Sequence, residues 1–199
     1  LWVMSTSYPE PRLWPNRMAA LAGSSRSTGV LGVSAGIAGS EATIYGLRPI
    51  KGAFHFLAEA DKHRETEESL EVFVLSYLKK YKTIYGFGRP FTPDDERIKP
   101  VVKIAENMGF GNGSFMSLAY DIEKILYKNK KMKMNIAVVN AAIIADAGLS
   151  LREYYYMASL AFSAGMFAPM IDGFDKPEGA FFPLSTARIN YLGEESRKW

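Results

Sequence analysis

The sequence of 199 residues contains no cysteine, only two histidines and no large excess of either charge. Without cysteine the chain has no disulfide and no thiolate, which is compatible with a reducing compartment. His55 and His63 alone leave too few imidazoles for a histidine-based zinc site, and we predict no metal. The net charge of +3 is too small to predict a nucleic-acid partner.

Long apolar runs and a secretory leader are also missing. We find no apolar run of the roughly 18 residues that cross a bilayer, and no signal peptide, so we expect a cytoplasmic protein without a membrane partner. The chain begins at Leu1-Trp2-Val3 without an initiator methionine, and we expect a preceding segment that carries part of the core and of the site. The composition, 48% hydrophobic and 23% charged, is that of a folded globular protein.

Apolar residues recur at helical spacing along most of the chain, and no segment shows the alternation of a strand. We therefore predict an all-α protein. Ser150 and Glu153 have the spacing of a capping box, and the three tyrosines that follow are expected in the core or at a subunit contact. The expected helices are residues 16–37 with a break near Thr28-Gly29, 51–61, a helix capped by Thr66, 98–108, 114–127 capped by Ser114, an apolar and deeply buried 135–147, and 151–170.

A glycine-rich loop at residues 82–97 leads into a predicted helix start. Gly86 and Gly88 free the backbone from side-chain obstruction, and Arg89 and Arg97 supply cations. Thr92-Pro93-Asp94-Asp95 reads as an N-cap, an N1 proline and an acidic first turn. Such a loop can hold an anion by its N–H groups and the helix dipole, and an ordinary helix connection has the same pattern.

A second basic segment, Lys128 to Lys133, has two interpretations that the sequence leaves open. It is either the solvated end of a helix or a docking site for a phosphate-bearing ligand.

The order of these motifs resembles a known family. Along the chain stand a small-residue helix, a turn with Gly46, the Gly86-Phe87-Gly88 loop, a buried helix starting at Asn135, a capped helix, and Arg188-Ile189-Asn190-Tyr191-Leu192-Gly193. Their order and spacing resemble the carboxyl-terminal two thirds of the citrate synthase family. The resemblance implies an all-helical homodimer, with residues 1–50 and 161–199 in a large domain and residues 51–160 in a small one.

The resemblance also implies a reaction and its substrates. The family condenses an acyl-coenzyme A with a 2-oxo acid, so coenzyme A or acyl-coenzyme A and a small organic acid are the expected ligands. The family's coenzyme A loop is matched by Gly86, Phe87, Gly88 and Arg97. Arg48 and Arg188 are the expected ligands of substrate carboxylates.

The three catalytic residues of the family are replaced in this sequence. The chemistry uses two histidines and a carboxylate, and the matching positions hold Tyr45, Arg89 and Ala137. Tyr45 can donate a hydrogen bond to a carbonyl and Arg89 can bind a carboxylate, so these two are the candidate catalytic residues. Alanine cannot act as the base. The carboxylates that remain as substitutes are those of Glu41, Asp94 and Asp95.

Three functions therefore stay open. The first is an acyltransferase-like enzyme of altered chemistry that forms or breaks a carbon–carbon bond. The second is a non-catalytic homologue that binds coenzyme A or an organic acid, and the third is a structural dimerisation module. Fold analogy alone does not decide among them.

Overall fold

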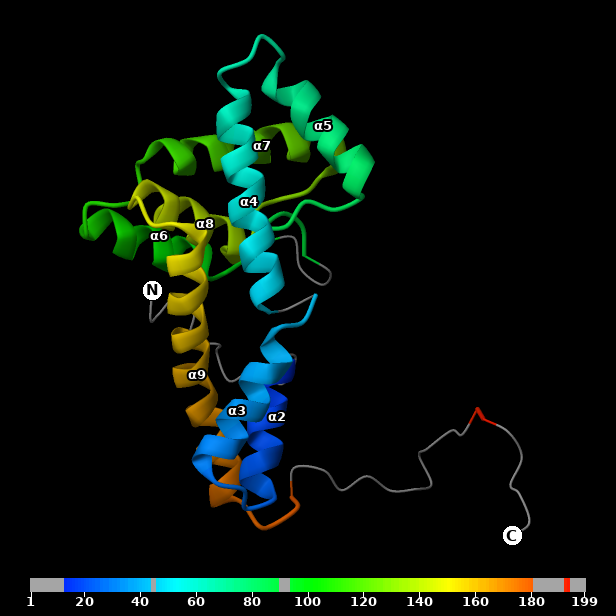
Figure 1. Ribbon diagram of the computed structural model, residues 1–199, viewed down its shortest axis with the longest axis vertical. Helices are drawn as coiled ribbons and strands as arrows, with labels where there is room; N and C mark the ends of the chain where they lie inside the picture. Colours follow the sequence, from blue (N-terminus) through cyan, green and yellow to red (C-terminus); the bar gives the residue numbers. More distant parts are fainter. Residues whose placement is uncertain (1–12, 44–45, 90–93, 181–191, 194–199) are drawn as a thin grey trace.

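A computed structural model describes residues 13–43, 46–89, 94–180 and 192–193, and within these residues the protein is all-α (Figure 1). The pairing of Phe87 with Met134 is an isolated bridge and not a strand. The all-α prediction is confirmed. The helices are α2 (Trp14–Ser24), α3 (Gly29–Ser40), α4 (Leu47–His63), α5 (Leu70–Tyr81), α6 (Ile98–Asn107), α7 (Ser114–Lys130), α8 (Ile136–Asp146) and α9 (Leu151–Asp175).

Buried apolar side chains form two clusters of unequal size. The larger cluster joins α4 to α8 with the first turns of α9 and contains Phe56 and Tyr154, two of the largest fully buried side chains. The smaller cluster consists of only four buried residues, from α2, α3 and the second half of α9: Ala19, Val33, Met166 and Met170. Helix α9 runs from one cluster to the other (Figure 1), so it connects the three-helix unit of α2, α3 and α9 to the rest. The domain division inferred from the sequence stays a prediction.

Glycines on α3 bring the three helices of this unit close together. A Cβ atom on Gly32 would lie 2.9 Å from the sulfur of Met170, and one on Gly36 would lie 2.5 Å from the sulfur of Met166. The flexible thioethers fill the space that the glycines leave. The small residues predicted in this part of the chain therefore serve close helix packing.

Helices begin as predicted where the capping residue is local. Ser150 accepts a hydrogen bond from the N–H of Glu153, whose carboxylate accepts one from the N–H of Ser150, which confirms the capping box. Thr28 caps α3 at the predicted break. Asn135 caps α8 and accepts from the N–H of Ala137 at 3.0 Å.

Two predicted features of helix starts are wrong. Helix α5 is capped by Ser69 and not by Thr66, whose hydroxyl donates backwards to the carbonyl of His63 at 2.8 Å and closes the preceding turn. Helix α6 begins at Ile98, as the predicted range 98–108 has it, but Asp95 lies outside its first turn. Of the predicted start at residues 92–95, residues 92 and 93 lie outside the described part of the chain.

The predicted cap of α7 is also wrong, because a residue from another helix takes its place. Ser114 is the first residue of α7, and the carboxylate of Asp146, at the end of α8, accepts hydrogen bonds from the N–H groups of Phe115 and Met116 at 2.8 and 3.0 Å. A carboxylate also suits the positive end of the helix dipole.

Helix α9 contains a longer uncharged segment than we expected, since we found no apolar run of roughly 18 residues in the sequence. It has 25 residues and no charge between residues 154 and 171, so by length and composition it can span a bilayer. Buried residues occur along its whole length, which is equally typical of a core helix, and one such helix is weak evidence for a membrane.

Candidate functional site

The Gly-Phe-Gly loop, residues 84–89, is fixed against the segment that precedes α8. The N–H of Gly88 donates to the carbonyl of Lys133 at 2.7 Å, and the N–H of Asn135 donates to the carbonyl of Gly86 at 2.8 Å. The side-chain amide of Asn135 donates to the carbonyl of Gly88 at 2.9 Å. The same asparagine caps α8, so the loop and the helix start are held by one residue.

Both glycines of this loop have a left-handed backbone, with φ of +92° at Gly86 and +80° at Gly88. A Cβ atom on Gly86 would lie 2.5 Å from the Cβ of Val138, so the loop touches α8 there. A Cβ on Gly88 would make an ordinary van der Waals contact at 3.4 Å with its nearest neighbour, a Met132 methyl carbon. The loop is thus packed less tightly at Gly88 than at Gly86.

The side chain of Phe87 belongs to the larger core cluster. It is buried, and its ring centroid lies 6.1 Å from that of Phe56. Phe87 therefore anchors the loop, and its contribution to any ligand site is through its backbone.

The start of α8 is closed by Asp95, which lies 41 residues upstream. Its buried carboxylate accepts hydrogen bonds from the Arg97 guanidinium, at 2.8 Å for both Nε and Nη2, and from the N–H of Ile136 at 2.9 Å. Burial raises the pKa of Asp95. The hydrogen bonds and the charge of Arg97, together with the hydrogen bond from the Ile136 N–H, have the larger opposite effect, so the pKa lies below its usual value. Asp95 is therefore a structural anion and a weak base.

Arg89 is bound by its own loop. Its Nη1 donates to the carbonyl of Asp94 at 2.7 Å and to the Glu96 carboxylate at 2.8 Å, and it lies 3.9 Å from Asp95. The ammonium of Lys133 lies 2.5 Å from the Asp94 carboxylate. We call this set the loop network: Arg89, Asp94, Asp95, Glu96, Arg97 and Lys133. Its three cations and three anions balance.

Of the remaining predicted site residues, the structure describes Arg48, which is exposed in the first turn of α4 and does not belong to the loop network. Tyr45 and Arg188 lie outside the described residues, so their roles stay predictions. The structure thus brings Gly86, Gly88, Arg89 and Arg97 together at the start of α8, and places Arg48 on a different element.

A second group of polar side chains lies where α3 ends and α4 and α9 begin. The Tyr155 hydroxyl donates to the Glu41 carboxylate, and the Lys51 ammonium lies 3.8 Å from Glu41 and 4.7 Å from the centroid of the Tyr155 ring. The hydrogen bond to Glu41 is the largest cause that raises the pKa of Tyr155. We call these residues the junction cluster. Sequence reasoning named only Glu41, because 114 residues separate it from Tyr155.

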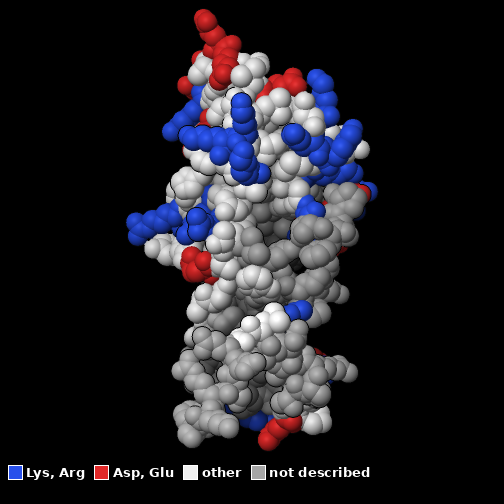
Figure 2. Space-filling model, turned by 90° about the vertical axis from the view of Figure 1, so that its right-hand side faces the viewer, with Lys and Arg blue, Asp and Glu red and all other residues white. Residues whose placement is uncertain are grey.

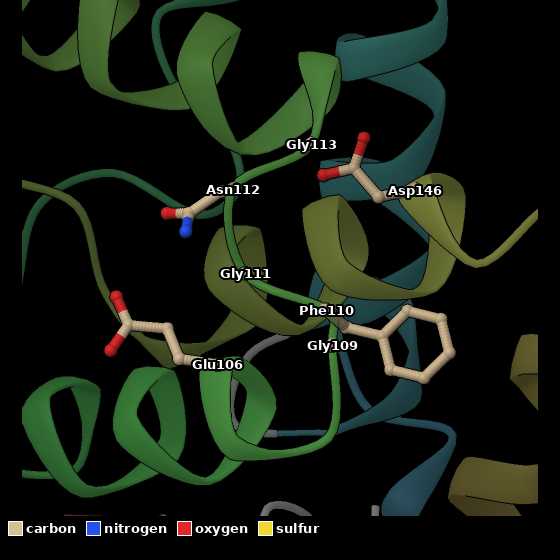
Figure 3. Close-up of a pocket in the computed structure, with 7 residues that line it drawn as sticks. All are labelled: Glu106, Gly109, Phe110, Gly111, Asn112, Gly113 and Asp146. Carbon is tan, nitrogen blue, oxygen red and sulfur yellow. The ribbon is translucent and has the colours of Figure 1, made fainter.

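A cavity of about 260 Å³ lies at the end of α6. It is lined by Glu106, Asn112, Asp146, Phe110 and the three glycines between residues 109 and 113 (Figure 3). The figure shows the Glu106 and Asp146 side chains on opposite sides of this loop. None of the predicted site residues that the structure describes lines the cavity.

Lysines gather at the carboxyl ends of α5 and α7, where Figure 2 shows Lys and Arg side chains over one face of the molecule. Lys82 and Lys131 follow these helices in the left-handed conformation that glycine usually adopts. The Lys131 and Lys133 ammoniums lie 5.0 and 5.7 Å from the centroid of the half-exposed Tyr127 ring. The basic segment predicted from the sequence therefore adjoins the loop network through Lys133.

Comparison with known proteins gives one family and one fold. The family model for the citrate synthase C-terminal domain matches residues 17–176. Among curated protein sequences none matches the chain.

Three solved structures illustrate the fold. The chain is similar over 100% of its length to 77% of the citryl-CoA lyase of Hydrogenobacter thermophilus, with a TM-score of 0.81 and 21% identity. It is similar over 100% of its length to 52% of the citrate synthase of Thermotoga maritima, with a TM-score of 0.72 and 15% identity. It is similar over 98% of its length to 33% of the ATP citrate lyase of Methanothrix soehngenii, solved with citrate and coenzyme A, with a TM-score of 0.73 and 16% identity. The chain thus spans about half of the second protein and a third of the last, and at these identities the likeness shows a citrate synthase-like fold.

Proposed function

The chain belongs to the citrate synthase family, and from this premise we propose that it binds coenzyme A or an acyl-coenzyme A at the Gly-Phe-Gly loop and acts on a small organic acid beside it. The proposed reaction forms or breaks a carbon–carbon bond without the family's two histidines and aspartate. The observation that carries the proposal is the loop itself, which three hydrogen bonds to residues 133–135 hold in place and which is packed less tightly at Gly88 than at Gly86.

Charge near the loop supports a phosphate-bearing ligand. Lys131 and Lys133 follow α7 and lie over the face of the Tyr127 ring. Ammonium groups attract phosphate as point charges, and an exposed aromatic ring offers a surface on which a base can stack. A nucleotide-containing thioester fits both features.

One observation favours the non-catalytic alternative. Arg89 already donates a hydrogen bond to the Glu96 carboxylate. The Asp95 carboxylate already accepts hydrogen bonds from Arg97 and from the N–H of Ile136. With alanine at position 137, the start of α8 offers no free base. A protein that only binds the thioester would therefore have the same loop network.

The test is a calorimetric titration of the protein with coenzyme A and acetyl-coenzyme A. We expect binding, and we expect Arg89→Ala to weaken it about tenfold or more, since a charge-assisted hydrogen bond contributes about 1.5–3 kcal/mol. The matched control is Arg64→Ala, which removes an exposed arginine paired with Asp61 at 3.6 Å far from the loop in sequence. No binding at millimolar coenzyme A would overturn the proposal.

We propose a second copy of the chain as the protein partner. Among the described residues, the apolar cluster of the three-helix unit has four buried members, and apolar side chains on the surface of this unit stay exposed: Val30, Leu31, Leu160, Phe167 and Ile171. Neither α3 nor residues 154–171 carry a charge, so two copies of this face meet without like-charge repulsion.

Light scattering after size-exclusion chromatography tests the partner. We expect a dimer that Leu160→Glu dissociates, whereas Val72→Glu, at an exposed apolar position on α5, leaves it intact. A wild-type monomer at concentrations of tens of micromolar would contradict the proposal.

A further inference from the structure

The junction cluster joins three helices at the place where the two core clusters meet (Figure 1). Glu41 follows α3, Lys51 is near the start of α4, and Tyr155 is near the start of α9. One carboxylate here accepts the phenolic hydrogen bond and also faces the ammonium, which in turn lies over the phenol ring. A base, an acid and a cation are thus held in mutual contact.

From this arrangement we propose that the junction cluster is the proton-transfer site for the α-carbon of an acyl-coenzyme A. The proposal rests on the proposed function, since the thioester must first bind the Gly-Phe-Gly loop. Glu41 acts as the base that position 137 lacks, and Tyr155 and Lys51 stabilise the enolate.

The position of the cluster relative to the loop supports this role. Lys51 is followed by Gly52, and a Cβ on Gly52 would lie 2.1 Å from the ring of Tyr85, the residue that precedes Gly86. The start of α4 is therefore in contact with the start of the loop. Arg48 is three residues before Lys51 and shares its side of the helix, where it is available for a substrate carboxylate.

Accessibility separates Glu41 from Asp95, and the partner separates it from Asp94, which is 75% exposed but lies 2.5 Å from the Lys133 ammonium. The Asp95 side chain is fully buried and bound on both oxygens, whereas the Glu41 and Lys51 side chains are 46% and 37% exposed. A substrate can therefore reach Glu41 and displace the Tyr155 hydroxyl from it. The alternative is that these contacts only hold the three helices together. The test must exclude this structural role.

The step balances with these groups alone. The Glu41 carboxylate forms an O–H bond with the proton as the α-carbon–hydrogen bond breaks. The electron pair of that bond becomes the carbon–carbon double bond of the enolate, and the π pair of the carbonyl moves to the thioester oxygen, which accepts the hydrogen bond of Tyr155 and faces the Lys51 ammonium. In the reverse step the protonated Glu41 returns a proton to the carbon, and in heavy water it returns a deuteron.

Deuterium exchange tests the inference without knowledge of the second substrate. The full chain is mixed with acetyl-coenzyme A in heavy water, and loss of the methyl proton signal is followed by NMR. We expect Glu41→Gln to slow the protein-dependent exchange about 100-fold or more, within the usual contribution of a general base. We expect Tyr155→Phe to slow it about tenfold, in the range of a lost hydrogen bond to a charged oxygen.

The control is Tyr156→Phe, which changes the neighbouring exposed tyrosine and should leave exchange unchanged. Coenzyme A affinity should stay within about threefold in every variant, a difference below 1 kcal/mol, so a loss of exchange at constant affinity distinguishes chemistry from a structural role. If the Tyr155→Phe variant does not fold, the test relies on Glu41→Gln alone.

Two results would overturn the inference and leave the proposed function intact. Wild-type protein that binds coenzyme A without exchanging the methyl protons, or exchange that Glu41→Gln leaves intact, would refute proton transfer here while the proposed ligand stands. Absence of coenzyme A binding would refute the proposed function, and this inference with it.

Discussion

Asp95→Ala should lower the free energy of unfolding by about 2–4 kcal/mol at neutral pH. The substitution removes the cap on the Ile136 N–H, which is about 1 kcal/mol. It removes the ion pair with Arg97, about 1 kcal/mol because that side chain is 44% exposed. It also leaves the partly buried N–H of Arg97 without its Asp95 acceptor, at about 1 kcal/mol or less.

Thermal and urea unfolding followed by circular dichroism measure this loss. For a protein of this length the midpoint should fall by about 5–15 °C. The control is Asp121→Ala, which removes an exposed pair with Lys124 at 2.9 Å and should change stability by less than about 0.5 kcal/mol. A loss below about 1 kcal/mol in Asp95→Ala would refute the role of this carboxylate.

The effect of Asp95 should also depend on pH. Its pKa is lowered in the folded protein, so its contribution is fully present well above the unfolded value of about 3.9 and disappears as pH falls through the folded value. The stability difference between the wild type and Asp95→Ala should therefore be constant above about pH 5 and shrink below about pH 4. An equal stability difference above pH 5 and below pH 4 would mean that Asp95→Ala lowers the stability through lost packing alone.

Three further predictions concern other parts of the fold. Gly86→Ala should lower the free energy of unfolding by about 2–5 kcal/mol, because alanine is strained in the left-handed conformation and its Cβ would clash with Val138. The control, Gly109→Ala, is also left-handed but has open space around it, and should lower the free energy by only about 1–2 kcal/mol. Equal losses in urea unfolding would contradict the contact between Gly86 and Val138. Arg26→Ala should cost about 1–3 kcal/mol, because its guanidinium binds two carbonyl groups at the end of α9, and a loss below about 0.5 kcal/mol in the same assay would exclude that role. Tyr154→Phe should change stability by less than about 1 kcal/mol in thermal unfolding, because among the described residues its buried hydroxyl has only the Asn140 side chain as a polar neighbour, without good hydrogen-bond geometry; a larger loss would show that this contact is a full hydrogen bond.

The sequence predicted the features whose signals lie within a few residues of each other. The capping box of Ser150 and Glu153 and the start of α8 at Asn135 were correct, because cap and helix start are adjacent in the chain. The burial of residues 135–147 followed from their apolar composition, and α8 is indeed buried along most of its length. The fold was recognisable from the order of these elements.

The sequence could not predict caps that come from a distant residue. Asp95 was read as part of a helix start because it follows a Thr-Pro pair, whereas it closes a helix 41 residues away. Asp146 displaced Ser114 as the cap of α7 in the same way. Tyr155 was expected in the core or at a subunit contact along with its neighbours, and only Tyr154 is fully buried. Such partners depend on how the helices pack.

The glycine-to-methionine contacts of the three-helix unit have a consequence for oxidation. This chain has no cysteine, so methionine sulfur is its main site of reversible oxidation. Met166 and Met170 are buried, with their sulfur atoms close to Gly36 and Gly32, respectively. Because burial shields these sulfur atoms from peroxide, we expect oxidation to follow opening of the helices, and the polar sulfoxide then opposes their closing. The rate at which peroxide modifies these two methionines therefore measures how often the unit opens.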